Sequence, residues 1–180
     1  MKPAPFHLER PATLAEAVAR LATLDGAKAM AGGQSLGPML NLRLATPDRV
    51  VDLSGIEELR TVTEDGGHMV YGALVTHADV EDGRAPDVGA NILARVAGGI
   101  AYRAVRNRGT MGGSLAHADP AADWVNALSA LGAEVEIAGA AGRRRLPLGA
   151  FLTGALTTAL EPGEILAAIR VPKVPASARF

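Results

Sequence analysis

Glycine and proline interrupt this chain at short intervals, with 21 Gly and 11 Pro among 180 residues. Glycine adopts backbone conformations that other residues avoid, and proline ends helices and strands, so the sequence predicts many short elements joined by turns. Aromatic residues make up only 3% of the chain, whereas 48% of the residues are hydrophobic. The core must therefore be built from Ala, Val, Leu and Ile, and the composition argues against disorder.

Local patterns predict an alternation of helices and strands. Thr13 and Glu16 form a capping box at the start of an amphipathic helix, which Gly26 ends. Asp119 and Pro120 are predicted to open another helix, with Asp119 as its cap and Pro120 in its first turn. Further helices are expected at residues 35–44, from 76 and at 87–96, and strands at 27–31, 49–53, 59–63, 68–71, 134–138, 143–146 and 165–171, with a hairpin turn at 65–67.

This order of elements predicts an α+β fold in two lobes. A strand–helix–strand unit comes first, and many short elements of both kinds follow it. We place the boundary near residues 53–58, which gives one lobe over residues 1–55 and a second over residues 56–180.

Two segments each join paired glycines to a hydroxyl residue beside a predicted helix start. The first is Ala31-Gly32-Gly33-Gln34-Ser35-Leu36, and the second contains Thr110-Met111-Gly112-Gly113-Ser114. Where side chains are missing, successive backbone N–H groups can converge on an anion, and the dipole of a following helix adds to the attraction. Two such segments suggest a ligand with two phosphates, or a long ligand held at both ends. Glycine pairs are also common in turns, and neither segment matches G-x-G-x-x-G or G-x-x-x-x-G-K-[ST].

Charge, cysteine content and hydropathy exclude several classes of protein. The formal net charge of -1 gives no broad electrostatic reason to bind nucleic acid or an acidic membrane surface. Because the chain has no cysteine, it cannot itself hold a disulfide, a thiolate zinc site or a cysteine-ligated iron–sulfur cluster. The longest uncharged stretch, residues 146–160, is shorter than the roughly 20 apolar residues of a membrane helix. The first residues lack the apolar core of a secretory signal, so we expect a cytoplasmic protein without membrane contact.

The two glycine segments and their surroundings resemble one known family. The similarity is carried by residues 31–36 and by the longer stretch 105–123, and the flanks that also match are residues 6–11, 51–53, 72–77 and 163–166. In these segments the chain is similar to the FAD-binding medium subunits of the molybdenum hydroxylases, a group that includes carbon monoxide dehydrogenase and xanthine dehydrogenase. The resemblance extends over essentially the whole chain in the same order.

The resemblance implies an α+β fold of the vanillyl-alcohol-oxidase (PCMH) type, with FAD between two subdomains. By analogy, residues 30–36 cradle the FAD diphosphate, and Thr110 with residues 112–114 closes on it from the second subdomain. Asp123 would hold the adenosine or ribityl end, Ile100 would lie along the flavin ring, and Leu166 would touch the ring through its backbone. The implied cofactor residues are Met30, Ala31, Gly32, Gly33, Gln34, Ser35, Leu36, Ile100, Thr110, Gly112, Gly113, Ser114, Asp123 and Leu166. No catalytic side chain and no metal ligand is implied.

Simpler explanations stay open for several acidic and histidine side chains. Asp123 also fits as an acidic residue in the first turn of a helix, where the helix dipole favours it. His117 also fits as a loop histidine that contacts cofactor or solvent. The other three histidines, His7, His68 and His77, are too scattered in the sequence to predict a metal site.

The arginines likewise have more than one explanation. Arg106 and Arg108 either face phosphates or a partner subunit, or are solvated or ion-paired. The run at residues 143–145 fits charges that protect an edge strand better than it fits a nucleic-acid patch.

In the family that the chain resembles, substrate is hydroxylated at a molybdenum centre on a large subunit. Electrons then pass through two [2Fe–2S] clusters on a small subunit to FAD, and from there to NAD⁺, oxygen or a quinone. The resemblance therefore implies an FAD-dependent electron-transfer subunit of an oxidoreductase, with a molybdopterin-containing large subunit and a [2Fe–2S] small subunit as partners. The lack of cysteine agrees with this division of labour.

Family members continue into a C-terminal α+β domain that usually contacts the flavin, whereas this sequence stops at residue 180. A shortened, split or partial chain is expected to bind FAD more weakly. Two other functions remain open: a truncated, non-catalytic FAD-binding or assembly module, and a different nucleotide-binding domain that uses the same loops.

Overall fold

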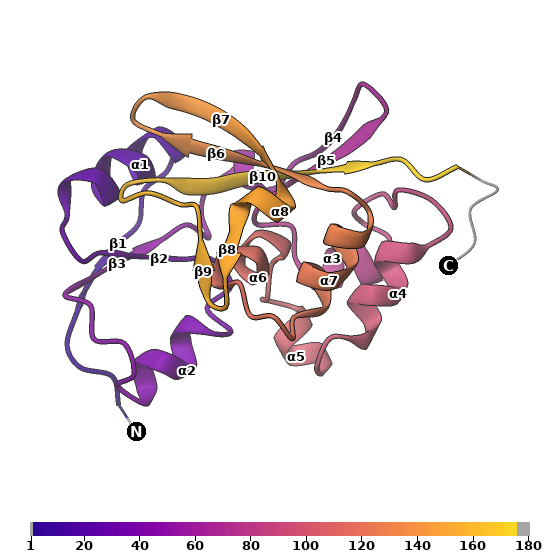
Figure 1. Ribbon diagram of the computed structural model, residues 1–180. Coiled ribbons are helices and arrows are strands. Elements are labelled where there is room, and N and C mark those ends of the chain that lie inside the picture. The colour runs from indigo at the N-terminus through magenta and orange to yellow at the C-terminus, as the bar shows by residue number, and fades with distance from the viewer. Residues whose placement is uncertain (1, 176–180) are drawn as a thin grey trace.

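Two β-sheets of different size form the framework of this protein, seen here in a computed structural model that describes residues 2–175 (Figure 1). The smaller sheet has three parallel strands in the order β1 (His7–Glu9), β3 (Arg49–Asp52) and β2 (Lys28–Met30). Parallel strands need crossover connections. Helix α1 (Leu14–Thr23) supplies the connection between β1 and β2, and helix α2 (Leu36–Asn41) lies in the connection between β2 and β3.

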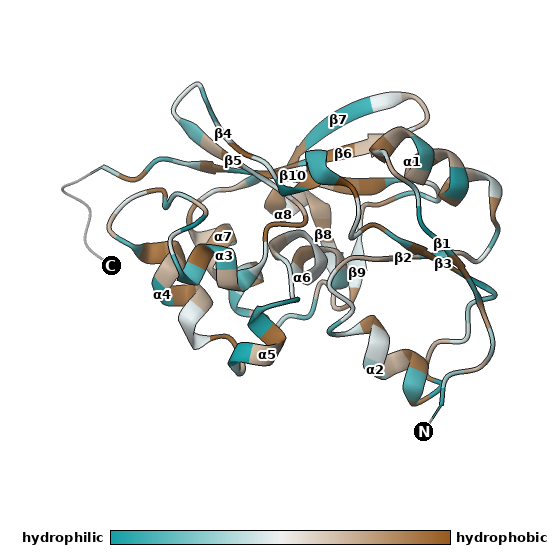
Figure 2. Ribbon diagram, turned by 180° about the vertical axis from the view of Figure 1, so that it is seen from behind, coloured by the Kyte–Doolittle hydropathy of each residue, from teal (hydrophilic) through white to brown (hydrophobic). Residues whose placement is uncertain are grey.

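The larger sheet has five strands, and every neighbouring pair is antiparallel. Their order is β4 (Val62–Asp65), β5 (His68–Gly72), β10 (Ile165–Pro172), β6 (Glu134–Gly139) and β7 (Gly142–Pro147). The central strand β10 is buried along nearly its whole length, whereas the edge strand β7 is largely hydrophilic (Figure 2). The charged edge fits the prediction made for residues 143–145, because charges on an edge strand discourage pairing with other chains.

Short helices lie on one side of the larger sheet (Figures 1 and 2). They are α3 (His77–Glu81), α4 (Ile92–Gly99), α5 (Arg103–Arg106), α6 (Met111–His117), α7 (Asp123–Ala130) and α8 (Leu148–Phe151), and a hairpin of β8 (Leu152–Gly154) and β9 (Thr157–Thr158) follows them. Trp124 and Leu128 of α7 and Leu115 of α6 are fully buried against Val135 and Ile169 of the sheet. Burying such side chains is the main source of stability for this lobe.

A second hydrophobic core joins the two sheets through α1. Its buried residues come from α1, from β3 and the segment after it, from the segment after β5, and from strands β6 and β10: Leu14, Ala17, Val18, Val51, Leu53, Ile56, Leu59, Leu74, Ala138, Ile165 and Ala167. The first helix therefore packs against both sheets. The division of the chain into residues 1–55 and 56–180 remains a prediction.

The capping box predicted for α1 forms only in part. Thr13 accepts a hydrogen bond from the amide of Glu16 (3.2 Å), as predicted, but the Glu16 carboxylate accepts from the amide of Ala12 (2.8 Å). A complete capping box occurs at α3, where Thr76 and Asp79 each accept a hydrogen bond from the other's amide. This confirms the helix start expected at Thr76.

Two helices begin later than the sequence predicts, and in both cases the aspartate near the expected start accepts hydrogen bonds from amides further along the chain. Helix α7 begins at Asp123 instead of Pro120, because the Asp119 carboxylate accepts from the amide of Ala121 (2.9 Å) and closes a turn. Helix α4 begins at Ile92, well after Asp87. The Asp87 carboxylate accepts from the amide of Gly89 (2.9 Å) in the preceding loop and from that of Ala94 (3.0 Å) in the first turn of α4.

Most predicted strands occur within one residue of their expected ends. The exception is the strand expected at residues 59–63, which is wrong: a 3₁₀ helix, η1 (Glu57–Arg60), occupies its first part and β4 follows. Strand β1 was not predicted. The helix expected over residues 35–44 ends at Asn41, and Arg43 beyond it has a positive φ of 57°.

Within residues 2–175, no helix is both long enough and apolar enough to cross a bilayer.

Candidate functional site

The two glycine segments, far apart in the sequence, are in contact. A β-carbon added to Gly32 would lie 1.8 Å from the carbonyl oxygen of Arg108, so these two stretches of backbone touch. A β-carbon on Gly113 would lie 3.6 Å from the β-carbon of Ala31. Glycine is required at residue 32 because no side chain fits between the segments. The fold therefore brings together the two loops that the sequence singled out.

The first segment carries a run of free backbone donors. Within the part of the chain that the structure describes, the N–H groups of residues 31–36 donate to no protein acceptor. Gly33 has a φ of 69°, which favours glycine, and the Ser35 side chain makes no capping bond to α2. Successive unbonded N–H groups are the donors from which anion-binding sites are built.

The second segment differs, because its amides are already bonded within the protein. Met111 donates to the carbonyl of Val75 (3.0 Å), and Gly112 donates to that of Ala73 (3.0 Å). Gly113 donates to the side-chain oxygen of Thr110 (3.0 Å), which caps α6. The expectation that Gly112 and Gly113 offer free amides is therefore wrong. A β-carbon on Gly112 would lie 2.4 Å from that of Ala73, so this glycine permits close packing instead.

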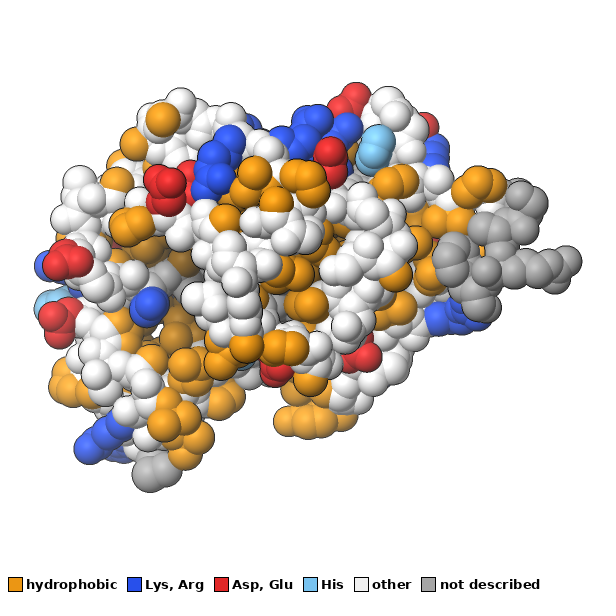
Figure 3. Space-filling view, viewed as in Figure 1, with side chains coloured by type: hydrophobic (Ala, Val, Ile, Leu, Met, Phe, Trp, Pro, Cys, Tyr) orange, Lys and Arg blue, Asp and Glu red, His pale blue; other side chains and the backbone are white. Residues whose placement is uncertain are grey.

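A hollow of about 240 Å³ lies where the two segments meet. Its walls come from four separate parts of the chain, and its lining residues are Ala31, Gly32, Ser54, Arg60, Leu74, Thr76, Asn107, Arg108 and Thr110. Of these, Ser54, Arg60, Leu74, Thr76 and Asn107 were not predicted as site residues. No sequence signal marks Ser54, which precedes η1, or Arg60, which ends it, because their place beside the hollow depends on tertiary packing. In the space-filling view, the surface is also notched between the α2 end of the small sheet and the helices of the large one (Figure 3).

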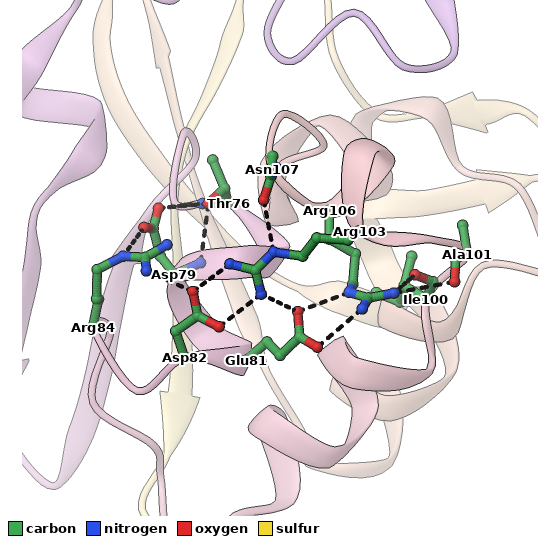
Figure 4. A network of polar contacts seen from close by, with 10 residues as sticks. All are labelled: Thr76, Asp79, Glu81, Asp82, Arg84, Ile100, Ala101, Arg103, Arg106 and Asn107. Carbon is green, nitrogen blue, oxygen red and sulfur yellow. Dashed lines mark hydrogen bonds and ion pairs between the residues drawn. The ribbon is translucent and has the colours of Figure 1, made fainter.

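The turn after α4 is fixed by a network of arginines and carboxylates (Figure 4). Arg106 donates from Nη1 to the carbonyl oxygens of Ile100 (3.0 Å) and Ala101 (3.1 Å), and its other nitrogens bond both oxygens of Glu81. Ala101 has a φ of 42°, a conformation that a residue with a β-carbon rarely adopts. Arg106 therefore holds a strained turn in place, and Ile100 belongs to that turn.

A second arginine strengthens the same network at its exposed side. Arg103 donates to Glu81 (2.8 Å) and to Asp82 (2.7 Å), and Arg84 bonds Asp79 and Asp82. Hydrogen bonds from Arg106 and Arg103 lower the pKa of Glu81, and those from Arg103 and Arg84 lower the pKa of Asp82. The pKa of Asp79 is lowered against the opposing effect of burial, by its hydrogen bond with Thr76 and then by that with Arg84. Arg106 is therefore ion-paired, which is one of the alternatives that the sequence left open for this residue.

The buried side chain of His77 packs against the backbone that leads into the second segment. Its Nδ1 accepts a hydrogen bond from the indole N–H of Trp124 (2.9 Å), and both rings are buried. A β-carbon on Gly109 would lie 2.6 Å from Nε2 of His77, so the chain passes directly over the imidazole. Burial and the charge of Arg106 lower the pKa of His77 to about 4, against a smaller opposing effect of Asp123. A neutral histidine in this position acts as a packing and hydrogen-bonding group.

The remaining predicted residues lie apart from the hollow. Ile100 ends α4 and is half-buried, and Asp123 is exposed in the first turn of α7. Leu166 is buried in β10, within the core of the larger sheet. Among residues 2–175, no group of three or more His, Cys, Asp or Glu side chains could hold a metal ion.

Comparison with known proteins gives matches over nearly the whole chain. The family described as FAD binding domain in molybdopterin dehydrogenase matches residues 4–174. The carbon monoxide dehydrogenase medium chain of Hydrogenophaga pseudoflava is 39% identical, over 96% of this chain and 60% of its own length. The nicotine 6-hydroxylase medium subunit of Paenarthrobacter nicotinovorans is 36% identical, over 97% of this chain and 62% of its own length. This chain therefore spans about 60% of the length of these relatives.

Solved structures agree with the sequence matches. Carbon monoxide dehydrogenase from Hydrogenophaga pseudoflava superposes with a TM-score of 0.93 at 40% identity, over 98% of this chain and 62% of that one. Quinoline 2-oxidoreductase from Pseudomonas putida 86 gives 0.92 at 40% identity, over 97% and 61%. UDP-N-acetylenolpyruvylglucosamine reductase from Thermus caldophilus gives 0.54 at 17% identity, over 94% and 56%, which is a likeness of fold alone.

Proposed function

This chain belongs to the family of FAD-binding domains found in molybdopterin dehydrogenases, and from that membership we propose that it is the FAD-holding part of an electron-transfer subunit. The membership confirms the expected α+β fold of PCMH type and FAD as the cofactor. What the whole complex oxidises, and which chains accompany this one, belong to the proposal.

The free amides of residues 31–36 are the observation that carries the proposal. The FAD diphosphate bears negative charge that must be met by donors once it leaves water, and unbonded N–H groups supply them without reorganisation. Gly32 and Gly33 keep side chains out of the approach, and Gly32 also lets the second segment pack closely behind the loop. The residues present therefore fit the cofactor that the family implies.

The other predicted residues take supporting roles in this proposal. Thr110 and Ser114 offer hydroxyl groups beside the diphosphate loop. The amides of Gly113 and Ser114 are bonded to Thr110 within α6, and the amide of Gly112 is bonded to the carbonyl of Ala73. Ile100, on the turn held by Arg106, packs against a ring of the cofactor. Asp123 accepts hydrogen bonds from sugar or ribityl hydroxyls, and Leu166 borders the site from β10.

Bound FAD supplies the redox chemistry, so the chain needs no acid, base or nucleophile of its own. Its work is to bind the cofactor, orient it and limit the access of water. We propose that a [2Fe–2S] small subunit delivers electrons to the site and that a molybdopterin-containing large subunit oxidises the substrate. The designation of relatives as medium chains or medium subunits of dehydrogenases supports partners of this kind.

Titration with FAD tests the proposal directly. We expect the flavin absorbance bands to shift on binding, and the protein to gain stability against heat. At a free FAD concentration 100 times the dissociation constant, the gain is about 2.7 kcal/mol. Riboflavin, which lacks the diphosphate, is the matched ligand and should bind far more weakly. An unchanged flavin spectrum together with an unchanged melting temperature at saturating FAD would contradict the proposal.

A further inference from the structure

A second hollow, of about 280 Å³, lies on the face of the larger sheet that points away from helices α6 and α7. Side chains alternate between the two faces of a strand. Ile137 and Ile169 are buried on the helix side. Their neighbours in sequence, Glu136 and Arg170, therefore project to the opposite face, where they line the hollow. Of the described residues, none lines both this outer hollow and the hollow between the glycine segments.

The floor of the outer hollow is made of small side chains. Gly72, Ala167 and Ala168 line it beside Val70. A β-carbon on Gly72 would lie 2.2 Å from the carbonyl oxygen of Leu59, so η1 packs directly on the sheet at this point and forms one wall. A ligand in the outer hollow would therefore rest on a largely apolar floor and meet charged groups at its sides.

Arg170 lines the outer hollow with unused hydrogen-bond donors. Its side chain is only 7% exposed, yet within residues 2–175 only Nη1 is hydrogen-bonded, to Asp65 (2.6 Å). Nε is buried without a partner, because Glu134 lies 3.7 Å away and is too distant for a hydrogen bond. Glu136 is likewise 3.8 Å from Nη1. Buried donors are nearly always paired, so we expect a further acceptor for this guanidinium.

Carboxylates and arginines alternate around the outer hollow instead of forming a positive and a negative pole. Arg143 lies 3.5 Å from Glu58 and 3.9 Å from Glu136. Side chains of both charges are also close together at the top of the space-filling view (Figure 3). Among the described lining residues, an anion would meet three carboxylates and a cation would meet two arginines. A neutral ligand avoids both repulsions.

Hydroxyl groups suit this lining because each can donate and accept a hydrogen bond through one oxygen. The half-exposed carboxylates need donors, whereas Arg170 needs an acceptor. Two hydroxyls on adjacent carbons can serve a carboxylate and a guanidinium that lie side by side, as Asp65 and Arg170 do. The volume is just below the roughly 300–1,000 Å³ typical of pockets for drug-sized ligands, so a ligand with a single ring fits.

We propose that the outer hollow binds a neutral ligand with hydroxyl groups on adjacent carbons, of the size of a monosaccharide or a cyclic polyol. Arg170 donates to one hydroxyl, Asp65 accepts from its neighbour, and the exposed hydroxyl of Thr63 bonds a third. The carbon atoms of the ring lie over Val70 and Ala168. This site does not rest on the proposed function.

myo-Inositol is the probe that tests the proposal, in a titration of the whole ¹⁵N-labelled chain followed by NMR. We expect the amide signals of β4, β5 and β10 to shift until the site is saturated, and those of residues 31–36 to stay where they are. Cyclohexanol is the matched ligand, because it has the same ring with a single hydroxyl. It should bind far more weakly.

Two variants of the lining identify the site. Thr63→Val removes one hydroxyl from an exposed side chain and should weaken binding by about threefold or more. Arg170→Lys keeps the charge but loses the planar fork, and should weaken binding by about tenfold or more. Thr153→Val is the matched control, since Thr153 is exposed in β8 outside the outer hollow. Circular dichroism melting verifies folding, and Thr63→Val decides if Arg170→Lys does not fold.

The proposal is overturned if myo-inositol shifts no amide of these strands, if cyclohexanol shifts them equally, or if Thr63→Val binds as tightly as the original chain. Sodium acetate or ammonium chloride that shifted the same amides more strongly, at equal concentration, would also overturn it, because the outer hollow would then take an ion. None of these outcomes bears on the proposed function, which titration with FAD tests separately.

Discussion

Gly32 illustrates how one missing β-carbon lets two distant loops meet. We expect Gly32→Ala to push residues 31–36 away from the second segment, because the new β-carbon would lie 1.8 Å from the Arg108 carbonyl oxygen. The clash is with backbone, which cannot move aside as a flexible side chain can. FAD titration should show affinity reduced by about tenfold or more, equal to about 1.4 kcal/mol.

Gly37→Ala is the control for this substitution. Gly37 lies in α2 of the same lobe, has open space around its α-carbon and has no positive φ. Alanine there should leave FAD affinity unchanged and should stabilise the helix by up to about 1 kcal/mol. If both variants bind FAD as the original chain does, the contact between the segments is not needed for the site.

The lowered pKa of His77 predicts that the free energy of unfolding decreases as the pH falls from neutral. Its folded-state pKa of about 4 lies below its ordinary value of 6.5, so the unfolded chain binds more protons between these limits. Stability contributed by the neutral imidazole is complete above pH 6.5 and is lost as the pH falls towards 4. The loss reaches about 1.4 kcal/mol per pH unit within that window.

Urea unfolding at pH 4.5 to 7 checks this effect by comparing the original chain with His77→Gln. Glutamine keeps an acceptor for the indole N–H of Trp124 but cannot take up the proton. The variant should therefore show a flatter pH dependence in this range. His117→Gln changes a histidine at the end of α6 that does not bond Trp124, so this variant should keep the original slope. Equal slopes in all three proteins would refute the role of His77.

At the scale of elements, the network between α3 and α5 shapes the turn that carries Ile100. We expect Arg106→Gln to lower the free energy of unfolding by about 2 kcal/mol, because all four hydrogen bonds of its side chain come from a charged group that is mostly shielded from water. The carbonyls of Ile100 and Ala101 would lose their donor, so hydrogen exchange in residues 99–106 should become faster.

Arg103→Gln provides the comparison within the same network. Arg103 bonds Glu81 and Asp82 but does not bond the turn, and its side chain is 47% exposed. Exposed ion pairs contribute little, so its loss should cost less stability and leave exchange in the turn unchanged. Faster exchange of equal size in both variants would mean that the network as a whole, not Arg106, fixes the turn.

For the whole molecule, α1 couples the two sheets. Leu14→Ala should lower the free energy of unfolding by about 2–5 kcal/mol, because Leu14 is 4% exposed within the core that the sheets share. Trp124, the only tryptophan, lies in the other core, so its fluorescence reports on the larger lobe. We expect fluorescence and far-ultraviolet circular dichroism to shift together in urea.

Leu44→Ala is the control on this scale, because Leu44 is 72% exposed and should change stability little. If Leu14→Ala shifts the circular dichroism transition while the fluorescence of Trp124 keeps its original midpoint, the lobes unfold independently. That result would favour the predicted division at residue 55 as a boundary between separate folding units.

Local residue patterns determined much of this protein without any three-dimensional information. Strand ends, the cap of α1 at Thr13 and the two glycine segments are encoded by neighbours in the chain, and hydrogen bonds and hydrophobic spacing act over those short distances. The resemblance to a flavoprotein family also rested on contiguous motifs. Where a local rule failed, as at Asp119, another local hydrogen bond competed with the expected one.

The tertiary structure alone decided which backbone N–H groups and which arginine side chains are bonded within the protein and which are not. Both glycine segments look alike in sequence, yet only the first keeps its amides unbonded, because Ala73 and Val75 lie where they can accept from the second. Arg106 and Arg108 stand two positions apart, yet one is ion-paired and the other lines the hollow with Arg60. Contacts between residues far apart in the chain determine such differences, and no local pattern specifies them.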